Sequence, residues 1–340
     1  MADAHRGPRY QLAMAAAKAT QAALTAAHRN GGQLPGVIAE KIDPQILADV
    51  PRPKTVVCVS GTNGKTTTNN LLNDLLADNG YEVVNNRAGG NVANGIQSTL
   101  IRNATMSGGT KKDMAVMELD ELSFRKVLPY LTPDVILVTN LYRDSFSRNA
   151  NPDFIFNVMS HYVSPKTKLV LNADDLISCR LAPQDANRVY YSIGRLADDT
   201  AEPQGIVCDL TACPVCGGKL EYDYCHLRHL GHATCKSCGF TNPEPDYELT
   251  ALDREAHTFT VCERSHEGAP THTYRYGNYS ITNLYNLFST VVVARELGLS
   301  AEAIGASLER GINVTALRYT EEEADGKRLV AVASKGENST

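Results

Sequence analysis

A glycine-containing turn with one lysine and four threonines is the part of this sequence best suited to phosphate chemistry. It spans residues 60–68 (SGTNGKTTT), after a β-branched run at 55–59 and before a stretch of helical character at 66–79. Gly61 and Gly64 let the backbone curl so that successive N–H groups can point inward and cradle phosphate oxygens. A strand before the turn and a helix after it are the context of a P-loop, so we predict a nucleotide site here.

The side chains of this loop have distinct expected roles. Lys65, read as an exposed loop charge, would reach the β- and γ-phosphates, and the Thr66 hydroxyl would bind Mg²⁺. The usual G-x-x-x-x-G-K-[ST] pattern is not met literally, because Val59 occupies its first glycine position. The alternative is a strand–helix turn with a chance Lys-Thr pair, which the flanking elements disfavour. The predicted ATP-binding residues of the loop are Gly61, Thr62, Asn63, Gly64, Lys65, Thr66 and Thr67.

Four of the nine cysteines form two CxxC pairs, Cys213/Cys216 and Cys235/Cys238, with the 18 residues 217–234 between them. Two such pairs at this separation match a zinc ribbon. Four thiolates close a tetrahedral Zn²⁺ site without a position for water, so the metal would be structural. A redox CxxC is less consistent with two matched pairs. Weaker candidate ligands in or beside the same segment are Cys208, Cys225, His226, His229 and His232.

The number and pattern of the cysteines also indicate the cellular compartment of the protein. An odd number of cysteines with two metal-type pairs points to a reducing compartment rather than to a disulfide framework, so we predict a cytoplasmic protein. Cys58 and Cys262 lie in strand-like runs and are expected to be buried packing residues.

The elements around these residues predict an α/β fold. Short apolar runs at 55–59, 81–84, 114–117, 135–139 and 169–171 have the character of strands, with helical stretches between several of them. This alternation predicts a mostly parallel sheet flanked by helices. Further expected elements are a helix at 10–30 with Leu12, Ala16, Ala19, Ala23 and Ala27 on one side, a connecting segment at 31–53, strand-like alternation at 247–261, and helices at 283–297 and 301–310.

Length and composition suggest how these elements are divided. A chain of 340 residues corresponds to about two domains. We predict an N-terminal helix and connecting segment at 1–50, an ATP-binding domain from 51–204 and 246–315, and a zinc-ribbon insert at 205–245 between its halves. Residues 316–340 would begin a further C-terminal domain.

The charge balance excludes some classes of partner. With 33 Lys and Arg against 38 Asp and Glu, the net charge of −5 disfavours a general nucleic-acid binder. The ribbon itself carries only Lys219, Arg228 and Lys236 as basic residues, so we expect no nucleic-acid partner. The Ala-rich stretch 12–27 contains Lys18 and is too interrupted for a transmembrane helix, and an amphipathic helix explains it better than a signal peptide.

The loop and the motifs that follow it resemble those of the Mur ligase family. The sequence GTNGKTT at 61–67 is that family's form of the loop, with its first glycine later than usual. Family-like motifs then follow in order: Glu118 at a strand end, TNLYRD at 139–144, NADD at 172–175, and TNLYN at 282–286. The resemblance implies ATP and Mg²⁺ as cofactors, Glu118 as a magnesium ligand beside Thr66, and contacts of Asn283 and Asn286 near the adenine. In this family ATP phosphorylates a carboxylate and an amine attacks the acyl phosphate, which makes Lys65 and Glu118 the expected catalytic residues of this chain.

A Mur-type core interrupted by a four-cysteine ribbon resembles one branch of the family, the MurT-type synthetase subunits of lipid II isoglutaminyl synthase. The likeness implies an ATP-dependent carbon–nitrogen ligase that amidates the α-carboxylate of D-glutamate in the lipid II stem peptide, giving D-isoglutamine. It implies a GatD-type glutaminase as heterodimer partner that supplies ammonia, and peripheral contact with the cytoplasmic membrane face through lipid II. A catalytic aspartate is expected in a C-terminal domain beyond Thr340.

Some motifs depart from that branch and leave alternatives open. After Asp144 the family continues Gln-x-Asp-Arg, whereas residues 145–148 (SFSR) keep only the arginine. Likewise Arg318 lacks its usual preceding glycine, and Gly336-Glu337 replaces an Asn-Pro. One alternative is a Mur- or folylpolyglutamate-type ligase that adds an amino acid. The other is a non-catalytic scaffold that binds nucleotide and recruits a partner through its ribbon.

Overall fold

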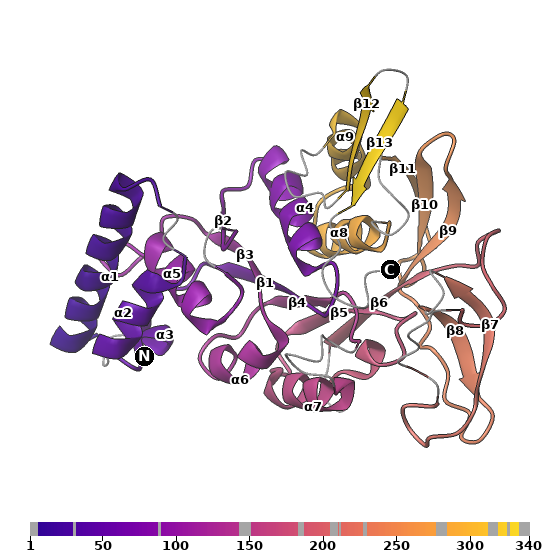
Figure 1. Ribbon diagram of the computed structural model, residues 1–340, viewed down its shortest axis with the longest axis horizontal. Helices are drawn as coiled ribbons and strands as arrows, with labels where there is room; N and C mark the ends of the chain where they lie inside the picture. Colours follow the sequence, from indigo (N-terminus) through magenta and orange to yellow (C-terminus); the bar gives the residue numbers. More distant parts are fainter. Residues whose placement is uncertain are drawn as a thin grey trace.

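A mixed β-sheet runs through the centre of the molecule (Figure 1). The computed structural model of the chain describes residues 6–29, 32–87, 90–142, 151–182, 187–204, 210, 212–226, 230–276, 284–311, 319–324 and 327–332. The sheet has nine strands in the order β11-β10-β9-β6-β5-β4-β1-β3-β2. These strands are β1 Thr55–Ser60, β2 Val83–Asn85, β3 Met114–Glu118, β4 Val135–Val138, β5 Lys168–Asn172, β6 Asn187–Ile193, β9 Tyr247–Asp253, β10 Thr258–Glu263 and β11 Thr271–Arg275.

The sheet is parallel from β2 through β9 and antiparallel in its last two pairings. Strand β1 pairs in parallel with β3 on one side and β4 on the other, and the parallel pairing continues through β5, β6 and β9. Strands β10 and β11 then extend the sheet in antiparallel pairs. The predicted α/β fold with a mostly parallel sheet flanked by helices is confirmed. The strands β6 and β11 were not predicted from the sequence.

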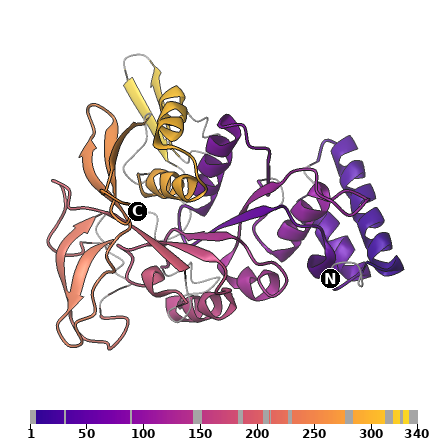
Figure 2. The ribbon, with the colours of Figure 1, turned by 180° about the vertical axis from the view of Figure 1, so that it is seen from behind.

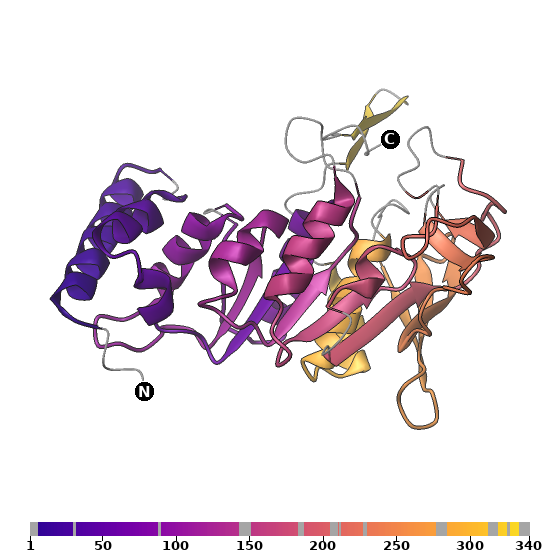
Figure 3. The ribbon, with the colours of Figure 1, turned by 90° about the horizontal axis from the view of Figure 1, so that it is seen from below.

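Helices cover both faces of the sheet (Figure 3). Alternate residues of β1 enter different cores: Val57 and Val59 pack with α4, α8 and α9, whereas Val56 and Cys58 pack with α1, α2, α5, α6 and α7. Burial on both faces explains why β1 is a continuous apolar run. The helices are α1 Pro8–Ala26, α2 Leu34–Ile42, α3 Ile46–Asp49, α4 Lys65–Asp78, α5 Ala93–Asn103, α6 Phe124–Val127, α7 Pro152–Tyr162, α8 Leu284–Glu296 and α9 Ala301–Arg310.

The N-terminal region differs from the prediction in two ways. Helix α1 buries the side formed by Tyr10, Ala13, Met14 and Ala17, whereas Leu12, expected on the buried side, is 61% exposed. The face predicted through Ala16, Ala19, Ala23 and Ala27 was therefore wrong. The expected connecting segment 31–53 also contains α2 and α3, so most of it is helical.

A separate two-stranded hairpin, β7 Leu220–His226 and β8 Leu230–Cys235, lies at the end of the molecule opposite to α1 (Figures 1 and 2). It has a small core of its own, formed by Leu176, Cys213, Leu220, Ala233 and Cys235. A second hairpin, β12 Tyr319–Ala324 and β13 Lys327–Val332, also stands apart from the main sheet. Among the described helices, none combines the length and apolar character that crossing a bilayer would require.

Candidate active site

The predicted phosphate loop connects β1 to α4 with two residues in the left-handed region. Gly61 has a φ of 121° and Gly64 a φ of 81°. A Cβ atom on Gly61 would lie 2.3 Å from Thr139 Oγ1, and one on Gly64 would lie 2.1 Å from Asn286 Oδ1. Both the backbone conformation and the lack of space therefore require glycine here. The spacing of these glycines, noted in the sequence, has a structural cause.

The end of β4 holds the loop from one side. The Asn63 N–H donates to Asn140 Oδ1 at 3.0 Å, and the Thr139 hydroxyl donates to the Asn63 carbonyl at 2.6 Å. The Tyr142 N–H donates to Thr62 Oγ1 at 2.9 Å. Thr139, Asn140 and Tyr142 of the 139–144 motif thus lie against the loop and fix its shape. Arg143 and Asp144 of the same motif lie outside the described residues.

Lys65 begins α4 and is not the exposed loop charge that was expected. Its side chain is 14% exposed, and Nζ donates to Glu121 Oε1 at 2.8 Å and to the carbonyl oxygens of Gly61 and Thr62. Burial raises the pKa of Glu121, and the Lys65 ammonium opposes this rise. No role had been assigned to Glu121 from the sequence, although its place three residues after Glu118 was a usable signal.

Glu118 lies at the carboxyl end of β3, next to the start of α4. The Thr66 hydroxyl donates to Glu118 Oε2 at 2.8 Å, and Asn91 Nδ2 donates to Oε1 at 2.8 Å. The Asn86 side chain forms two hydrogen bonds with the backbone of Glu118. It accepts from the Glu118 N–H at 2.9 Å and donates to the Glu118 carbonyl at 2.8 Å. The structure thus brings together Thr66 and Glu118, the two predicted magnesium ligands. Asn86, which continues β2, was not predicted.

The turn 172–175 joins the strand ends on this side of the sheet. Asp175 accepts from the Leu141 N–H at 2.7 Å and so ties the end of β5 to the end of β4. Asp174 accepts from the hydroxyls of Ser192 at 2.7 Å and Tyr285 at 2.8 Å. Burial raises the pKa of both carboxyl groups, and these hydrogen bonds oppose the rise. Both aspartates are therefore satisfied inside the protein and position its loops.

The start of α8 lies beside the phosphate loop. Asn286 Oδ1 accepts from the Thr68 hydroxyl at 3.2 Å and is the atom that a Cβ on Gly64 would meet. Asn283, the other residue that the resemblance places near the adenine, lies beyond the described part of this helix. The phosphate loop and Asn286 are thus neighbours, as a shared nucleotide site requires.

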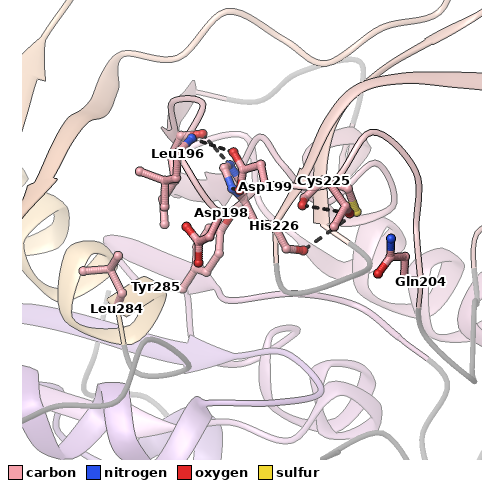
Figure 4. Close-up of a pocket in the computed structure, with 10 residues that line it drawn as sticks. Leu196, Asp198, Asp199, Gln204, Cys225, His226, Leu284 and Tyr285 are labelled. Carbon is pink, nitrogen blue, oxygen red and sulfur yellow. Dashed lines mark hydrogen bonds and ion pairs between the residues drawn. The ribbon is translucent and has the colours of Figure 1, made fainter. Parts of the chain in front are cut away.

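A cavity of about 300 Å³ opens next to the same end of α8 (Figure 4). Leu284 and Tyr285 line it from the helix, Leu196 and Asp199 from the segment after β6, and His226 from β7. His226 Nδ1 lies 2.6 Å from Asp199 Oδ1, and Nε2 lies 2.8 Å from the carbonyl oxygen of Ile193. Both ring nitrogens are therefore engaged, and His226 joins β7 to the end of β6 and the segment that follows it.

The four cysteines of the CxxC pairs come together as predicted. Their Sγ atoms all lie within 4.8 Å of one another, with Cys213 and Cys238 3.7 Å apart and Cys216 and Cys235 3.5 Å apart. Tetrahedral Zn–S bonds of about 2.3 Å would place sulfurs about 3.8 Å apart, so the cluster has suitable dimensions for Zn²⁺. The glycines after each pair, Gly217 and Gly239, have φ values of 75° and 73°, as the tight turns require.

The other cysteines and histidines of this region have different surroundings. His232 pairs with Asp223 at 2.6 Å, and Cys225 is buried outside the four-cysteine cluster. Cys208 and His229 fall outside the described ranges. Cys58 is fully buried in a hydrophobic core, as predicted, and this burial raises the pKa of its thiol to about 12. Cys262 is partly exposed, contrary to the expectation of burial.

Comparisons with known proteins agree with this geometry. The model of the Mur ligase middle domain matches residues 59–214. A solved pseudomurein peptide ligase type C from Methanothermus fervidus is similar with a TM-score of 0.59 and 27% identity, over 78% of this chain and 51% of that one. The chain is thus similar to members of the Mur ligase family in both sequence and fold.

The chain is also similar to subunit MurT of lipid II isoglutaminyl synthase (glutamine-hydrolyzing). It is 35% identical to the protein from Staphylococcus aureus (strain COL) over 295 residues, covering 86% of this chain and 64% of the relative. It is 29% identical to the one from Streptococcus pneumoniae (strain ATCC BAA-255 / R6), covering 82% and 61%. The chain therefore spans a little under two thirds of the length of the curated relatives it matches.

Proposed function

We propose that this chain is the ATP-dependent part of an amidating carbon–nitrogen ligase of peptidoglycan biosynthesis, and with it of cell-wall biogenesis and cell shape. The observation that carries the proposal is the group formed by Lys65, Thr66 and Glu118 at the carboxyl ends of β1 and β3. In a parallel α/β sheet this edge is where ligands bind. The similarity to the MurT subunits supports the choice of reaction.

The nucleotide would lie along the phosphate loop toward α8. Backbone N–H groups of the loop and the start of α4 would face its phosphates, and Lys65 would contact the outer ones. Tyr285 lines the cavity, and the next residue, Asn286, meets the loop at Gly64. One turn of α8 therefore connects the phosphate loop to the cavity, so we place the base of ATP there.

The residues present suit Mg²⁺. The Thr66 hydroxyl, the Glu118 carboxylate and the Asn91 amide, whose oxygen could turn toward the ion, offer hard oxygen atoms of the kind Mg²⁺ prefers. Bound there, Mg²⁺ would offset the charge of the phosphates. Asn86 would keep the Glu118 carboxylate in place through its backbone.

The proposed reaction has two steps. A carboxylate resists attack by amines, so its oxygen first attacks the γ-phosphorus of ATP, and ADP leaves. Ammonia then attacks the carbonyl carbon of the acyl phosphate, loses a proton and expels phosphate, which leaves a primary amide. Lys65 would stabilise the charge that develops on the transferred phosphoryl group. The proposed substrate is the α-carboxylate of D-glutamate in the lipid II stem peptide, and the product D-isoglutamine.

We further propose that the ammonia comes from a separate GatD-type glutaminase, with which this chain forms a heterodimer. At neutral pH most ammonia is protonated and cannot attack, so a subunit that releases it beside the acyl phosphate raises the rate. The reaction would take place at the cytoplasmic face of the membrane, where the chain meets lipid II peripherally.

The four-cysteine cluster would hold one structural Zn²⁺. We propose that residues 205–245 form an insert between the two parts of the ATP-binding domain, 51–204 and 246–315. The bound metal would stabilise the fold of this insert. Asn242 Nδ2 donates to the Ala173 carbonyl at 2.6 Å, and the Arg180 guanidinium to the Pro214 carbonyl at 3.1 Å. The insert is therefore anchored on the turn 172–175 and on the segment that follows it.

The test is ATP turnover with lipid II and ammonium or glutamine, with and without the glutaminase partner. The proposal predicts ADP and amidated lipid II, with glutamine used only when the partner is present. Incorporation of an amino acid instead of ammonia would favour a ligase of the amino-acid-adding type. Tight nucleotide binding without turnover in the complete complex would favour a scaffold.

A further inference from the structure

The ammonium group of Lys65 is fully engaged by acceptors of the protein. It donates to the Gly61 carbonyl, to the Thr62 carbonyl at 3.3 Å and to Glu121 Oε1 at 2.8 Å. A lysine ammonium has three N–H donors, so these acceptors account for all of them. A phosphate oxygen can accept a hydrogen bond from Lys65 only if one of the three gives way.

Glu121 is the acceptor best able to give way. The two carbonyls belong to the loop backbone, which Thr139 and Asn140 hold by hydrogen bonds. Glu121 reaches Lys65 with a side chain from a short 3-10 turn, η1 (Glu121–Ser123), just after β3. Its carboxylate also carries the same sign of charge as a phosphate, so the two repel each other when both face one ammonium group.

Releasing Glu121 has a cost because its carboxylate is buried. Only 8% of the residue is exposed. Among the described residues, the charged groups that face it are Lys65 from α4 and Asp120 from its own turn. A buried carboxylate that loses its cationic partner is strongly disfavoured. The free energy of nucleotide binding must therefore offset the loss of the Lys65–Glu121 pair.

We propose that Glu121 competes with the phosphates of the nucleotide for Lys65 and so lowers the affinity of the phosphate loop for nucleotide. Glu121 is thus a positioning residue that acts through Lys65. After phosphoryl transfer it takes Lys65 back from the product phosphates and helps ADP to leave. The inference rests on the proposed function, because it assumes that the loop binds nucleotide.

The test is the Kd of MgADP, measured by calorimetry on the 340-residue chain and on its E121Q variant. Glutamine keeps the shape of the side chain and removes the charge, so the competition weakens. We expect the Kd to fall about tenfold, as for the loss of one competing hydrogen bond to a charged group. A merely structural role predicts weaker binding instead. D120N is the matched control, because it removes a neighbouring charge without touching the contact to Lys65.

The outcomes separate this inference from the proposed function. A Kd in E121Q equal to or above that of the wild type overturns the inference, and so does an equal tightening in D120N. If E121Q does not fold, Glu121→Asp replaces it, since the shorter side chain loses the 2.8 Å contact; an unchanged Kd in that variant again overturns the inference. A wild-type chain that binds no MgADP overturns the proposed nucleotide site and this inference with it.

Discussion

Replacing Gly64 by alanine tests the geometry of the phosphate loop most sharply, because the chain offers a matched control. Gly64 and Gly80 lie at the two ends of α4 with nearly equal φ values of 81° and 82°. A Cβ on Gly80 meets nothing within 4 Å, whereas one on Gly64 would lie 2.1 Å from Asn286 Oδ1. The two substitutions thus share the backbone strain and differ in the collision.

The magnitudes follow from that difference. Left-handed strain should cost about 1 kcal/mol in Gly80→Ala and a similar amount in Gly64→Ala. In Gly64→Ala the buried Asn286 must also move and lose its hydrogen bond from Thr68, and the loss of this buried hydrogen bond adds about 1–3 kcal/mol. Urea unfolding followed by circular dichroism gives both values.

A double variant completes the test. Asn286→Ala removes the side chain that a Cβ on residue 64 would meet. In this background Gly64→Ala and Gly80→Ala should lower the free energy of unfolding by nearly the same amount. The double-mutant cycle of positions 64 and 286 should therefore give a coupling energy of at least about 1 kcal/mol. Equal costs for Gly64→Ala and Gly80→Ala in the wild-type background would refute the close approach of α8 to the loop.

The remaining predictions concern charge and metal. Lys65→Ala should lower ATP turnover more than tenfold, because the lysine stabilises the transferred phosphoryl group; activity above about a tenth of wild type contradicts this. The substitution also leaves the buried Glu121 carboxylate without its cationic partner and should destabilise the chain, so circular dichroism must show that the variant is folded under the assay conditions. Replacing Cys213 and Cys216 together by serine should release one Zn²⁺ per chain and loosen the β7–β8 hairpin, and full zinc by elemental analysis would refute the assignment. Arg295→Met should destabilise the chain by about 3 kcal/mol at pH 7, because it removes the nearest cationic partner of the buried Glu263 carboxylate and leaves His266 and His272, at 3.6 and 3.8 Å, beside it. Burial alone would raise the pKa of Glu263, but Arg295 lowers this pKa below its usual value. The ion pair therefore stabilises the folded state at pH values above the unfolded pKa of Glu263. This stabilisation is lost as the pH falls through the lower pKa of the folded state. The difference between wild type and variant, measured by denaturation at pH 7 and pH 4, should therefore shrink in acid, and an equal difference at both pH values would contradict this reasoning.

Local patterns allowed much of the fold and of the candidate site to be predicted. The buried run of β1, the glycines of the loop and the two CxxC pairs each encode a local geometry, and the structure shows that geometry at all three. Glu118 could be placed because the carboxyl end of a parallel strand faces the ligand edge. These are features in which sequence spacing alone fixes the backbone or the donor set.

The errors arose where contacts distant in sequence decide the outcome. In α1 eight of the 19 residues are alanine, so periodicity says little about which side packs, and Met14 rather than Leu12 is buried. Helix α2 begins Leu34-Pro35-Gly36, which suggests a linker, yet proline suits the first turn of a helix. A Cβ on Gly36 would lie 2.2 Å from the Asn94 carbonyl oxygen, so the glycine allows α2 to approach α5 closely. The contacts of Glu121 and Asn86 likewise depend on which strands are neighbours.

Oxygen-isotope transfer tests the central claim, the activation of a carboxylate by ATP, most directly. Lipid II labelled with ¹⁸O in the α-carboxylate of its D-glutamate would be incubated with this chain, the glutaminase partner, MgATP and glutamine. If the γ-phosphoryl group is transferred to that carboxylate, ammonia then expels phosphate with one carboxylate oxygen. The account predicts one ¹⁸O atom in the released phosphate for each amide formed, and amidated lipid II with unlabelled phosphate would contradict it.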